Sequence, residues 1–246
     1  MLLLALLPSI PPPANVGVRE ATRVDWASYR KVSDLIADGF AARDATSTER
    51  SILAQALYRN LVEKFTSRNR RRNSLFLATD ERSGEVVGVC GIEMLDLSPT
   101  AKEPGQQGAA ATTIQGRPLL SNLAVGAAFR GRGTAKKLCR CVESTARSWG
   151  EDEILLKVES ENRRARNLYR SLGYRVVATL RDAEKPQPRP WGIEFVPTKQ
   201  VAMRKSLRGG LPLDNLDWLD ITTAAVCAGA AAAAGAWLVE GHLSLY

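Results

Sequence analysis

Residues 119–135, LLSNLAVGAAFRGRGTA, constrain the fold of this chain most, because an apolar run passes there into a turn rich in glycine and arginine and then into a helical pattern. The apolar run predicts a buried strand. Its strand-forming side chains are Leu119, Leu120, Leu123, Ala124 and Val125. Gly131 and Gly133 allow turn geometry and close approach of the backbone to a ligand. Helical spacing then recurs in Ala135, Leu138, Val142, Thr145 and Trp149.

A loop that opens a helix presents free amide groups and the positive end of the helix dipole, which attract anions. Arg130 and Arg132 add positive charge. The loop lacks the Gly-Lys-Ser/Thr ending of a nucleoside-triphosphate loop, and its GxGxxK pattern is not the GxGxxG of a dinucleotide site. Two interpretations remain from these residues: a phosphate loop of another kind, or a basic glycine turn without a ligand.

Two motifs resemble the GCN5-related N-acetyltransferase (GNAT) family. The first is R-x-x-G-x-A, formed by Arg130, Gly133 and Ala135, which resembles the acetyl-CoA pyrophosphate loop. The second resembles the signature N-x-x-A-x-x-L-Y-x-x-x-G-F/Y that closes the acetyl-CoA cleft. Its residues here are Asn162, Ala165, Leu168, Tyr169, Gly173 and Tyr174. The resemblance covers roughly residues 16–207 and is greatest to plastid members from plants and algae.

The resemblance implies an α/β fold, with a mixed, mostly antiparallel sheet flanked by helices. It also implies acetyl-CoA as co-substrate and no metal. The cofactor-binding residues that it implies are Leu123, Ala124, Val125, Arg130, Gly131, Arg132, Gly133, Thr134, Ala135, Asn162 and Tyr169.

The resemblance also implies roles in acetyl transfer to a primary amine. An amide near Val125 would polarise the thioester carbonyl, Asn162 would orient the pantetheine arm or a water, and Tyr169 would protonate the coenzyme sulfur. Tyr169 also fits a second interpretation, as part of the apolar stripe of its helix. The general base is left open. Relatives that acetylate protein N-termini have a glutamate in an L-E-V strand motif, but the corresponding residues here are Leu156-Lys157-Val158, with lysine in place of the glutamate.

Composition narrows the chemistry further. The net charge of +8 suits a phosphate-bearing ligand, nucleic acid or anionic lipid alike. The four cysteines include no CxxC pair, which argues against a disulfide framework and zinc. His242 is the one histidine and lies near the C-terminus, so a triad that uses histidine as base is excluded from the core motifs. Acids and bases are therefore expected to be Tyr, Glu, Asp or water.

Periodicity predicts the element order β-α-α-β-β-β-α-β-α-β-β. Asp25 is a predicted helix N-cap, and Phe40 is placed on the buried face of the first helix with Tyr29, Val32 and Ile36. Residues 182–192, DAEKPQPRPWG, are predicted to be a connection rather than a strand, with Trp191 either on the acceptor side or packed.

Two segments keep open interpretations. Residues 98–118 form a long Gly-, Pro- and Ala-rich loop that either lines the acceptor entrance or is disordered. The basic run at residues 68–72 is either a solvated turn or a contact for an anionic partner.

The predicted domain organisation has three parts. Residues 1–14 are a leader or disordered segment, residues 15–207 the acetyltransferase domain, and residues 208–246 a tail. Within the tail, residues 221–239 are nineteen residues without a formal charge. As a helix they would span about 28 Å against a hydrocarbon core of about 30 Å. A membrane-spanning helix, a partner-docking helix and a disordered tail all remain open.

The function that this sequence predicts is acetyl transfer from acetyl-CoA to a protein lysine or N-terminal amine. The alternatives are a small-amine acetyltransferase of the polyamine type, and a non-catalytic subunit of a membrane complex. The expected location is the chloroplast, with or without association with a membrane. The alternative location is the cytoplasm. Nucleic acid is not an expected partner, since no aromatic residue interleaves the basic run.

Overall fold

The computed structural model describes residues 15–22, 25–42, 44–66, 72–95 and 116–208 of the 246-residue chain. The helices and strands follow the predicted order, with one 3-10 helix added. They are β1 (Val16–Glu20), α1 (Trp26–Phe40), α2 (Ser47–Thr66), β2 (Asn73–Asp80), β3 (Val86–Leu95), β4 (Arg117–Val125), η1 (Ala127–Phe129), α3 (Thr134–Ser148), β5 (Glu153–Glu159), α4 (Arg163–Ser171), β6 (Arg175–Arg189) and β7 (Gly192–Ser206).

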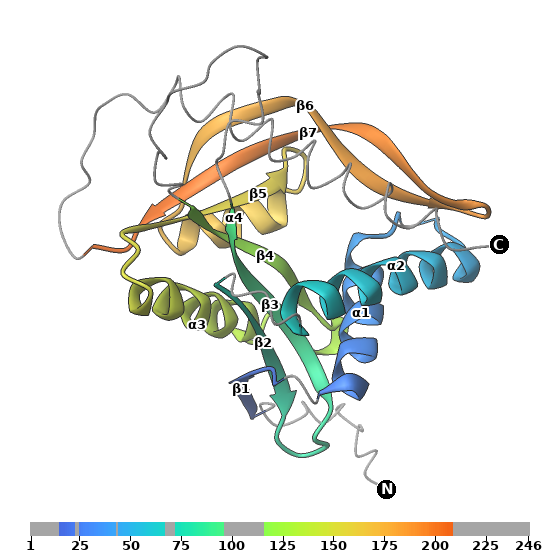
Figure 1. The fold of residues 1–246 in the computed structure, drawn as a ribbon, viewed down its shortest axis with the longest axis horizontal. Helices are drawn as coiled ribbons and strands as arrows, with labels where there is room; N and C mark the ends of the chain where they lie inside the picture. The colour runs from blue at the N-terminus through green and yellow to red at the C-terminus, as the bar shows by residue number, and fades with distance from the viewer. Residues whose placement is uncertain (1–14, 23–24, 43, 67–71, 96–115, 209–246) are drawn as a thin grey trace, which may run out of the picture.

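The seven strands form one sheet in the order β1-β2-β3-β4-β5-β7-β6. Every neighbouring pair is antiparallel except β4 and β5, which are parallel. The predicted mixed, mostly antiparallel sheet is therefore confirmed. Figure 1 shows β1 to β4 running through the middle of the molecule and β5, β6 and β7 crossing above them.

Helices cover both faces of the sheet because side chains alternate between the faces along each strand. On β2, Leu75 and Leu77 pack with α1 and α2, whereas Phe76 and Ala78 pack with α3. The cluster on the second face also includes Tyr169 of α4. The core is thus two apolar layers separated by the sheet.

The first helix buries the face that its periodicity predicts, except at its end. Tyr29, Val32 and Ile36 are at most 2% exposed, but Phe40 is 62% exposed. The prediction for Phe40 was wrong because α1 ends there, and Ala41 turns the chain into an extended conformation.

Asp25 occupies the predicted N-cap position of α1, but its carboxylate does not cap the helix. It accepts hydrogen bonds from the Thr22 amide (2.7 Å) and from the Arg19 guanidinium (2.8 Å) instead. These contacts, the Arg19 hydrogen bond above all, hold the pKa of Asp25 well below its usual range. The residue therefore fixes the β1–α1 connection rather than the helix end.

The structure overturns the prediction that residues 182–192 are a connection. β6 continues to Arg189 and β7 begins at Gly192, so the two strands form a long hairpin with Pro190 and Trp191 at its turn. The prediction was wrong because it took the prolines as a sign of a connection. β6 is an edge strand, and an edge strand tolerates residues that lack an amide donor. Trp191 is 82% exposed, so it does not pack as one interpretation held.

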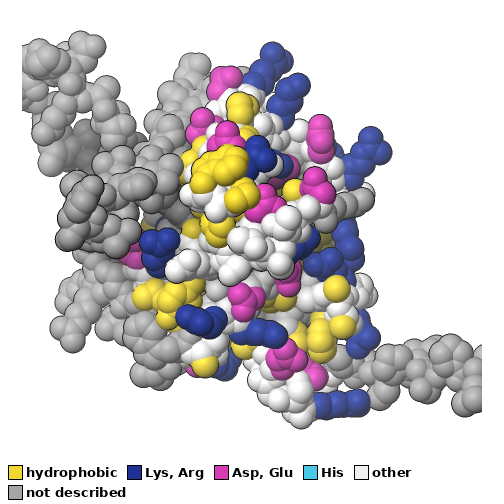
Figure 2. All heavy atoms as spheres, turned by 90° about the vertical axis from the view of Figure 1, so that its right-hand side faces the viewer, with side chains coloured by type: hydrophobic (Ala, Val, Ile, Leu, Met, Phe, Trp, Pro, Cys, Tyr) yellow, Lys and Arg dark blue, Asp and Glu magenta, His cyan; other side chains and the backbone are white. Residues whose placement is uncertain are grey.

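The hairpin reaches the face of the molecule that carries α1 and α2. Ile193 packs against the α1–α2 cluster, and Figure 1 shows the hairpin passing above α2. Figure 2 looks onto this side of the molecule, where basic and acidic side chains are interspersed with hydrophobic ones. The surface around the hairpin end therefore has no field of a single sign.

Several predictions lie outside the described residues. These are the 1–14 leader, most of the 68–72 and 98–118 segments, and the 221–239 helix. None of the described helices is long and apolar enough to cross a membrane. The three-part domain organisation stays a prediction.

Candidate functional site

The sheet opens between β4 and β5. These strands pair at Leu119 with Leu155 and at Leu120 with Leu156, and no pairing continues beyond. A register shift on β3 between Val89 and Gly91 gives β4 one extra residue, next to Asn122, whose φ is 55°. Such a bulge bends a strand and re-aims its backbone groups. Beyond Leu120, β4 therefore has a free edge that faces the opening.

Backbone groups of Val125 point to that free edge. Gly126 donates its amide to the Val87 carbonyl of β3 (2.9 Å), and alternation along a strand directs the groups of Val125 the other way. The Arg130 guanidinium confirms this direction, since its Nε donates to the Val125 carbonyl (2.8 Å). Arg130 therefore ties the glycine loop to the end of β4.

The glycine loop lies between β4 and α3 and includes η1. Gly131 and Gly133 have φ values of 79° and 82°, and a Cβ at either position would have no atom within 4 Å. The space before the helix is therefore open, and only the backbone conformation demands glycine. Arg132 lies over the Phe129 ring, 5.8 Å from its centroid.

The first turn of α3 has the features of an anion site. Gly133 is the N-cap and supplies no side-chain acceptor, and the turn contains no acidic residue. Thr134 is 2% exposed, and Ala135 is half-buried. The first amides of α3 are thus not capped by a side chain, and helix amides in that state favour phosphate.

The fourth helix carries the two predicted catalytic residues. Asn162 is its N-cap, and the Asn162 side-chain oxygen accepts a hydrogen bond from the Ala165 amide (3.0 Å). This contact engages the oxygen and leaves the side-chain NH₂ pointing away from the cap. Asn162 thus has a structural task besides the orienting role that the resemblance implies.

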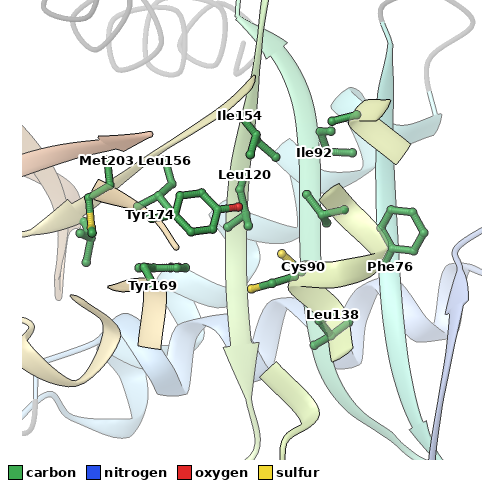
Figure 3. Close-up of a cluster of buried hydrophobic side chains, with 14 of the residues drawn as sticks. Phe76, Cys90, Ile92, Leu120, Leu138, Ile154, Leu156, Tyr169, Tyr174 and Met203 are labelled. Carbon is green, nitrogen blue, oxygen red and sulfur yellow. The ribbon is translucent and has the colours of Figure 1, made fainter. Parts of the chain in front are cut away.

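Tyr169 is 6% exposed and belongs to the core cluster that includes Leu138 and Val142 of α3. Its ring packs edge-to-face against the Tyr174 ring, with 5.7 Å between the ring centroids. Figure 3 shows both rings near Leu156 and Met203. Burial raises the pKa of the Tyr169 phenol well above its usual value. The hydroxyl is therefore a neutral donor at physiological pH, as a general acid must be.

The structure brings the predicted cofactor residues together from three elements. Leu123 and Val125 of β4 pack against the same cluster as Tyr169 of α4, while Ala124 packs on the α1–α2 face. The loop residues precede α3, which borders that cluster through Leu138. β4, the glycine loop and α4 thus surround one face of the opening.

Three polar features were not predicted from the sequence. Asn122 lies in the β4 bulge with a positive φ, which follows from the register of β3 against β4. Glu143 is 3% exposed and pairs with Lys205 at 2.6 Å, although nothing in the sequence links α3 to β7. Glu159 pairs with Lys185 at 3.0 Å, where a proline-rich connection was expected. In the described ranges, no three His, Cys, Asp or Glu side chains are grouped as a metal site.

Solved structures share this fold. Arabidopsis thaliana NAA60 in complex with acetyl-CoA matches with a TM-score of 0.54 and 15% identity, covering 78% of this chain and 98% of that one. The NatC complex bound to Gag peptide and CoA matches with a TM-score of 0.50 and 18% identity, covering 79% and 99% of the chains. At these identities the similarity shows the fold.

Sequence comparison shows the family. GCN5-related N-acetyltransferase 4, chloroplastic, from Arabidopsis thaliana is 37% identical over 70 residues, which are 28% of this chain and 24% of that relative. The match therefore spans about a quarter of that relative's length. The acetyltransferase (GNAT) family model matches residues 40–174, more than half of the chain. By this match, which contains the glycine loop, the opened β4 edge and α4, the chain belongs to the GNAT family of acetyltransferases.

Proposed function

We propose that the protein transfers the acetyl group of acetyl-CoA to an amino group of a protein, at the N-terminus or on a lysine. The observation that carries the proposal is the uncapped start of α3 beside the opened edge of β4. The first feature suits a pyrophosphate, and the second suits an amide-containing arm laid along a strand edge. Acetyl-CoA contains both groups in sequence.

Binding would proceed through the backbone. The amides of Gly131, Gly133 and Thr134 would receive the pyrophosphate, with Arg132 supplying positive charge near it. Arg130 would hold the loop in place through its bond to the Val125 carbonyl. The Val125 amide, on the free edge of β4, would bind the pantetheine arm.

Acetyl transfer forms a nitrogen–carbon bond and breaks the carbon–sulfur bond of the thioester. The arm would run back along β4 from the loop, so the Leu123 amide, near Val125, would polarise the thioester carbonyl, on whose oxygen negative charge develops. The departing sulfur requires a proton, for which Tyr169 is the proposed donor. Asn162 would place the arm or a water through its side-chain NH₂, since its oxygen holds the helix cap.

The acceptor would arrive on the α1–α2 face of the opening, opposite the phosphate site. The strand positions described there include Lys157, Glu159 and Lys185, a mixed set with more basic than acidic charge. A polycationic amine requires an acidic surface, so this set disfavours a polyamine. The NatC structure, bound to Gag peptide and CoA, also supports a peptide as acceptor. The chloroplast is the proposed location, from the name of the Arabidopsis relative.

The test is to incubate the full chain with isotope-labelled acetyl-CoA and a plastid protein extract, and then to map the label by mass spectrometry. We expect label on α-amino groups or lysine side chains, with acetyl-CoA binding measured by calorimetry. A chain that binds acetyl-CoA but labels only small amines would overturn the acceptor. A chain that neither binds acetyl-CoA nor labels any amine would overturn the enzyme.

A further inference from the structure

Acetyl transfer requires a group that takes the proton from the attacking amine, and the described residues contain no histidine for that task. From the geometry of the sheet we infer that Glu159 is this proton acceptor. The inference rests on the proposed function and adds the residue that the L-E-V comparison left open.

Glu159 lies at the open end of the β4–β5 pair. Leu155 is opposite Leu119 and Leu156 is opposite Leu120. Counted on from these pairs to the end of β5, Glu159 is level with Leu123, which lies with Asn122 in the β4 bulge. The Leu123 amide is the one proposed to polarise the thioester. The carboxylate thus ends the strand that borders the reacting group.

Alternation along β5 decides which way Glu159 points. Ile154, Leu156 and Val158 are buried in the cluster that packs on α3 and α4. β5 pairs with β7 without a register shift, so Leu155, Lys157 and Glu159 point to the opposite face. That face is the proposed entry side of the amine. Glu159 is two residues beyond Lys157, the position of the L-E-V glutamate, and on the same face.

Other carboxylates of the neighbouring strands are engaged elsewhere. Glu153, at the opposite end of β5, pairs with Arg117 and Arg204. Glu93 of β3 pairs with Lys64 of α2 at 2.8 Å. Of the described carboxylates on β3, β4 and β5, Glu159 is the one located at the opening.

The surroundings of Glu159 leave it accessible. Its side chain is 38% exposed and pairs with Lys185 of β6, which is 41% exposed. Lys157 lies on the same face as Glu159. The residue opposite Glu159 on β7 is the uncharged Gln200. A pair this exposed contributes little to folding, so replacing either partner is expected to leave the fold intact.

The step is balanced in atoms and electrons. A Glu159 carboxylate oxygen takes one proton from the amine, directly or through one water, while the nitrogen lone pair forms the bond to the acetyl carbon. The carbon–sulfur bond breaks with its electron pair on sulfur. Sulfur then receives a proton from Tyr169 or water.

The test compares Glu159→Gln with the parent chain, using synthetic peptides with a free α-amino group and no lysine as acceptors. We expect kcat/KM at pH 7 to fall by about 10²–10⁴, with acetyl-CoA affinity and melting temperature unchanged. The deficit should shrink as the pH rises past about 8, where a peptide α-amino group loses its proton without help. A structural defect would not be repaired in this way.

Two matched variants separate the base from its ion pair. Lys185→Met breaks the same pair but keeps the carboxylate, so it should lose less than about tenfold in rate. Glu161→Gln removes an exposed carboxylate two residues away and should match the parent. Parent-like turnover by Glu159→Gln, or an equal loss in Lys185→Met, would overturn the inference. A parent chain that fails to bind acetyl-CoA would instead count against the proposed function.

Discussion

Gly133 combines two properties that can be tested separately, a positive φ and a position before uncapped helix amides. Gly133→Asp would place a carboxylate where the pyrophosphate is proposed to bind. We expect acetyl-CoA binding to weaken at least tenfold, or about 1.4 kcal/mol, by calorimetry. Gly133→Asn carries the same shape and backbone strain without the charge and should weaken binding less.

A second control for Gly133 is Gly150, which lies just beyond the other end of α3. Its φ is 83°, and a Cβ added there would likewise have no atom within 4 Å. Gly150→Asp therefore introduces matched strain and charge away from the loop and should leave acetyl-CoA affinity unchanged. If both aspartate variants lose affinity equally, the phosphate cradle is wrong.

Tyr169 is the proposed proton donor, and Tyr169→Phe removes only its hydroxyl. We expect kcat to fall by about 10²–10⁴ with little change in acetyl-CoA affinity. Because burial raises the Tyr169 pKa above its usual value, the proton stays on the phenol as the pH rises through neutrality. The parent kcat should therefore show no decline from Tyr169 below a pH of about 10.

Tyr174 supplies the matched control for Tyr169, since the two rings are in edge-to-face contact in one core. The Tyr174 hydroxyl is buried near the Glu143 carboxylate but makes no hydrogen bond of normal geometry. Its removal in Tyr174→Phe should leave turnover at the parent level and lower the free energy of unfolding by no more than about 1.5 kcal/mol. A Tyr169→Phe chain that loses stability but not kcat would assign Tyr169 to the core alone.

The ion pair of Glu143 and Lys205 joins α3 to β7 across the core face. Lys205→Met would leave the Glu143 carboxylate, which is 3% exposed, without its cation. The free energy of unfolding is expected to fall by about 3–5 kcal/mol. Urea denaturation measures this change. The double variant Glu143→Leu/Lys205→Met should recover most of the loss, because no buried charge is left unpaired.

Arg208→Met is the exposed counterpart of that experiment. Arg208 pairs with Asp152, and both side chains are more than half exposed. Its loss should leave the free energy of unfolding nearly unchanged, because water screens an exposed ion pair. If Lys205→Met and Arg208→Met lowered the free energy of unfolding equally, burial would not be what makes the Glu143–Lys205 pair strong.

The elements differ in how far the sequence predicted them. Local signals were sufficient for α3 and α4, since each is set by its own periodicity and end residues. The extent of β6 was missed because the effect of Pro186 and Pro188 depends on whether the strand is at an edge, which only the whole sheet decides. The bulge at Asn122 and the position of Glu159 likewise follow from pairing between distant strands.

The chain as a whole includes a tail that lies outside the described residues, and all three interpretations of residues 221–239 stay open. If these residues span a bilayer, the full chain should remain with membranes through alkaline carbonate extraction. A chain that ends at Leu207, the limit of the predicted domain, should leave the membrane fraction and keep its acetyl-CoA affinity. Full-length protein in the carbonate supernatant would rule out the membrane helix.

The opening between β4 and β5 also divides the chain in a simple way. Strands β1 to β4 with α1, α2 and α3 end at Ser148, and β5 to β7 with α4 begin at Glu153. A cut at the exposed Gly150 would thus yield two fragments, each with a continuous part of the sheet. Neither fragment holds a complete core, since Leu120 and Leu138 come from one and Leu156 and Tyr174 from the other. The molecule is therefore suited to fragment complementation, in which acetyl transfer would return only when the two pieces reassemble.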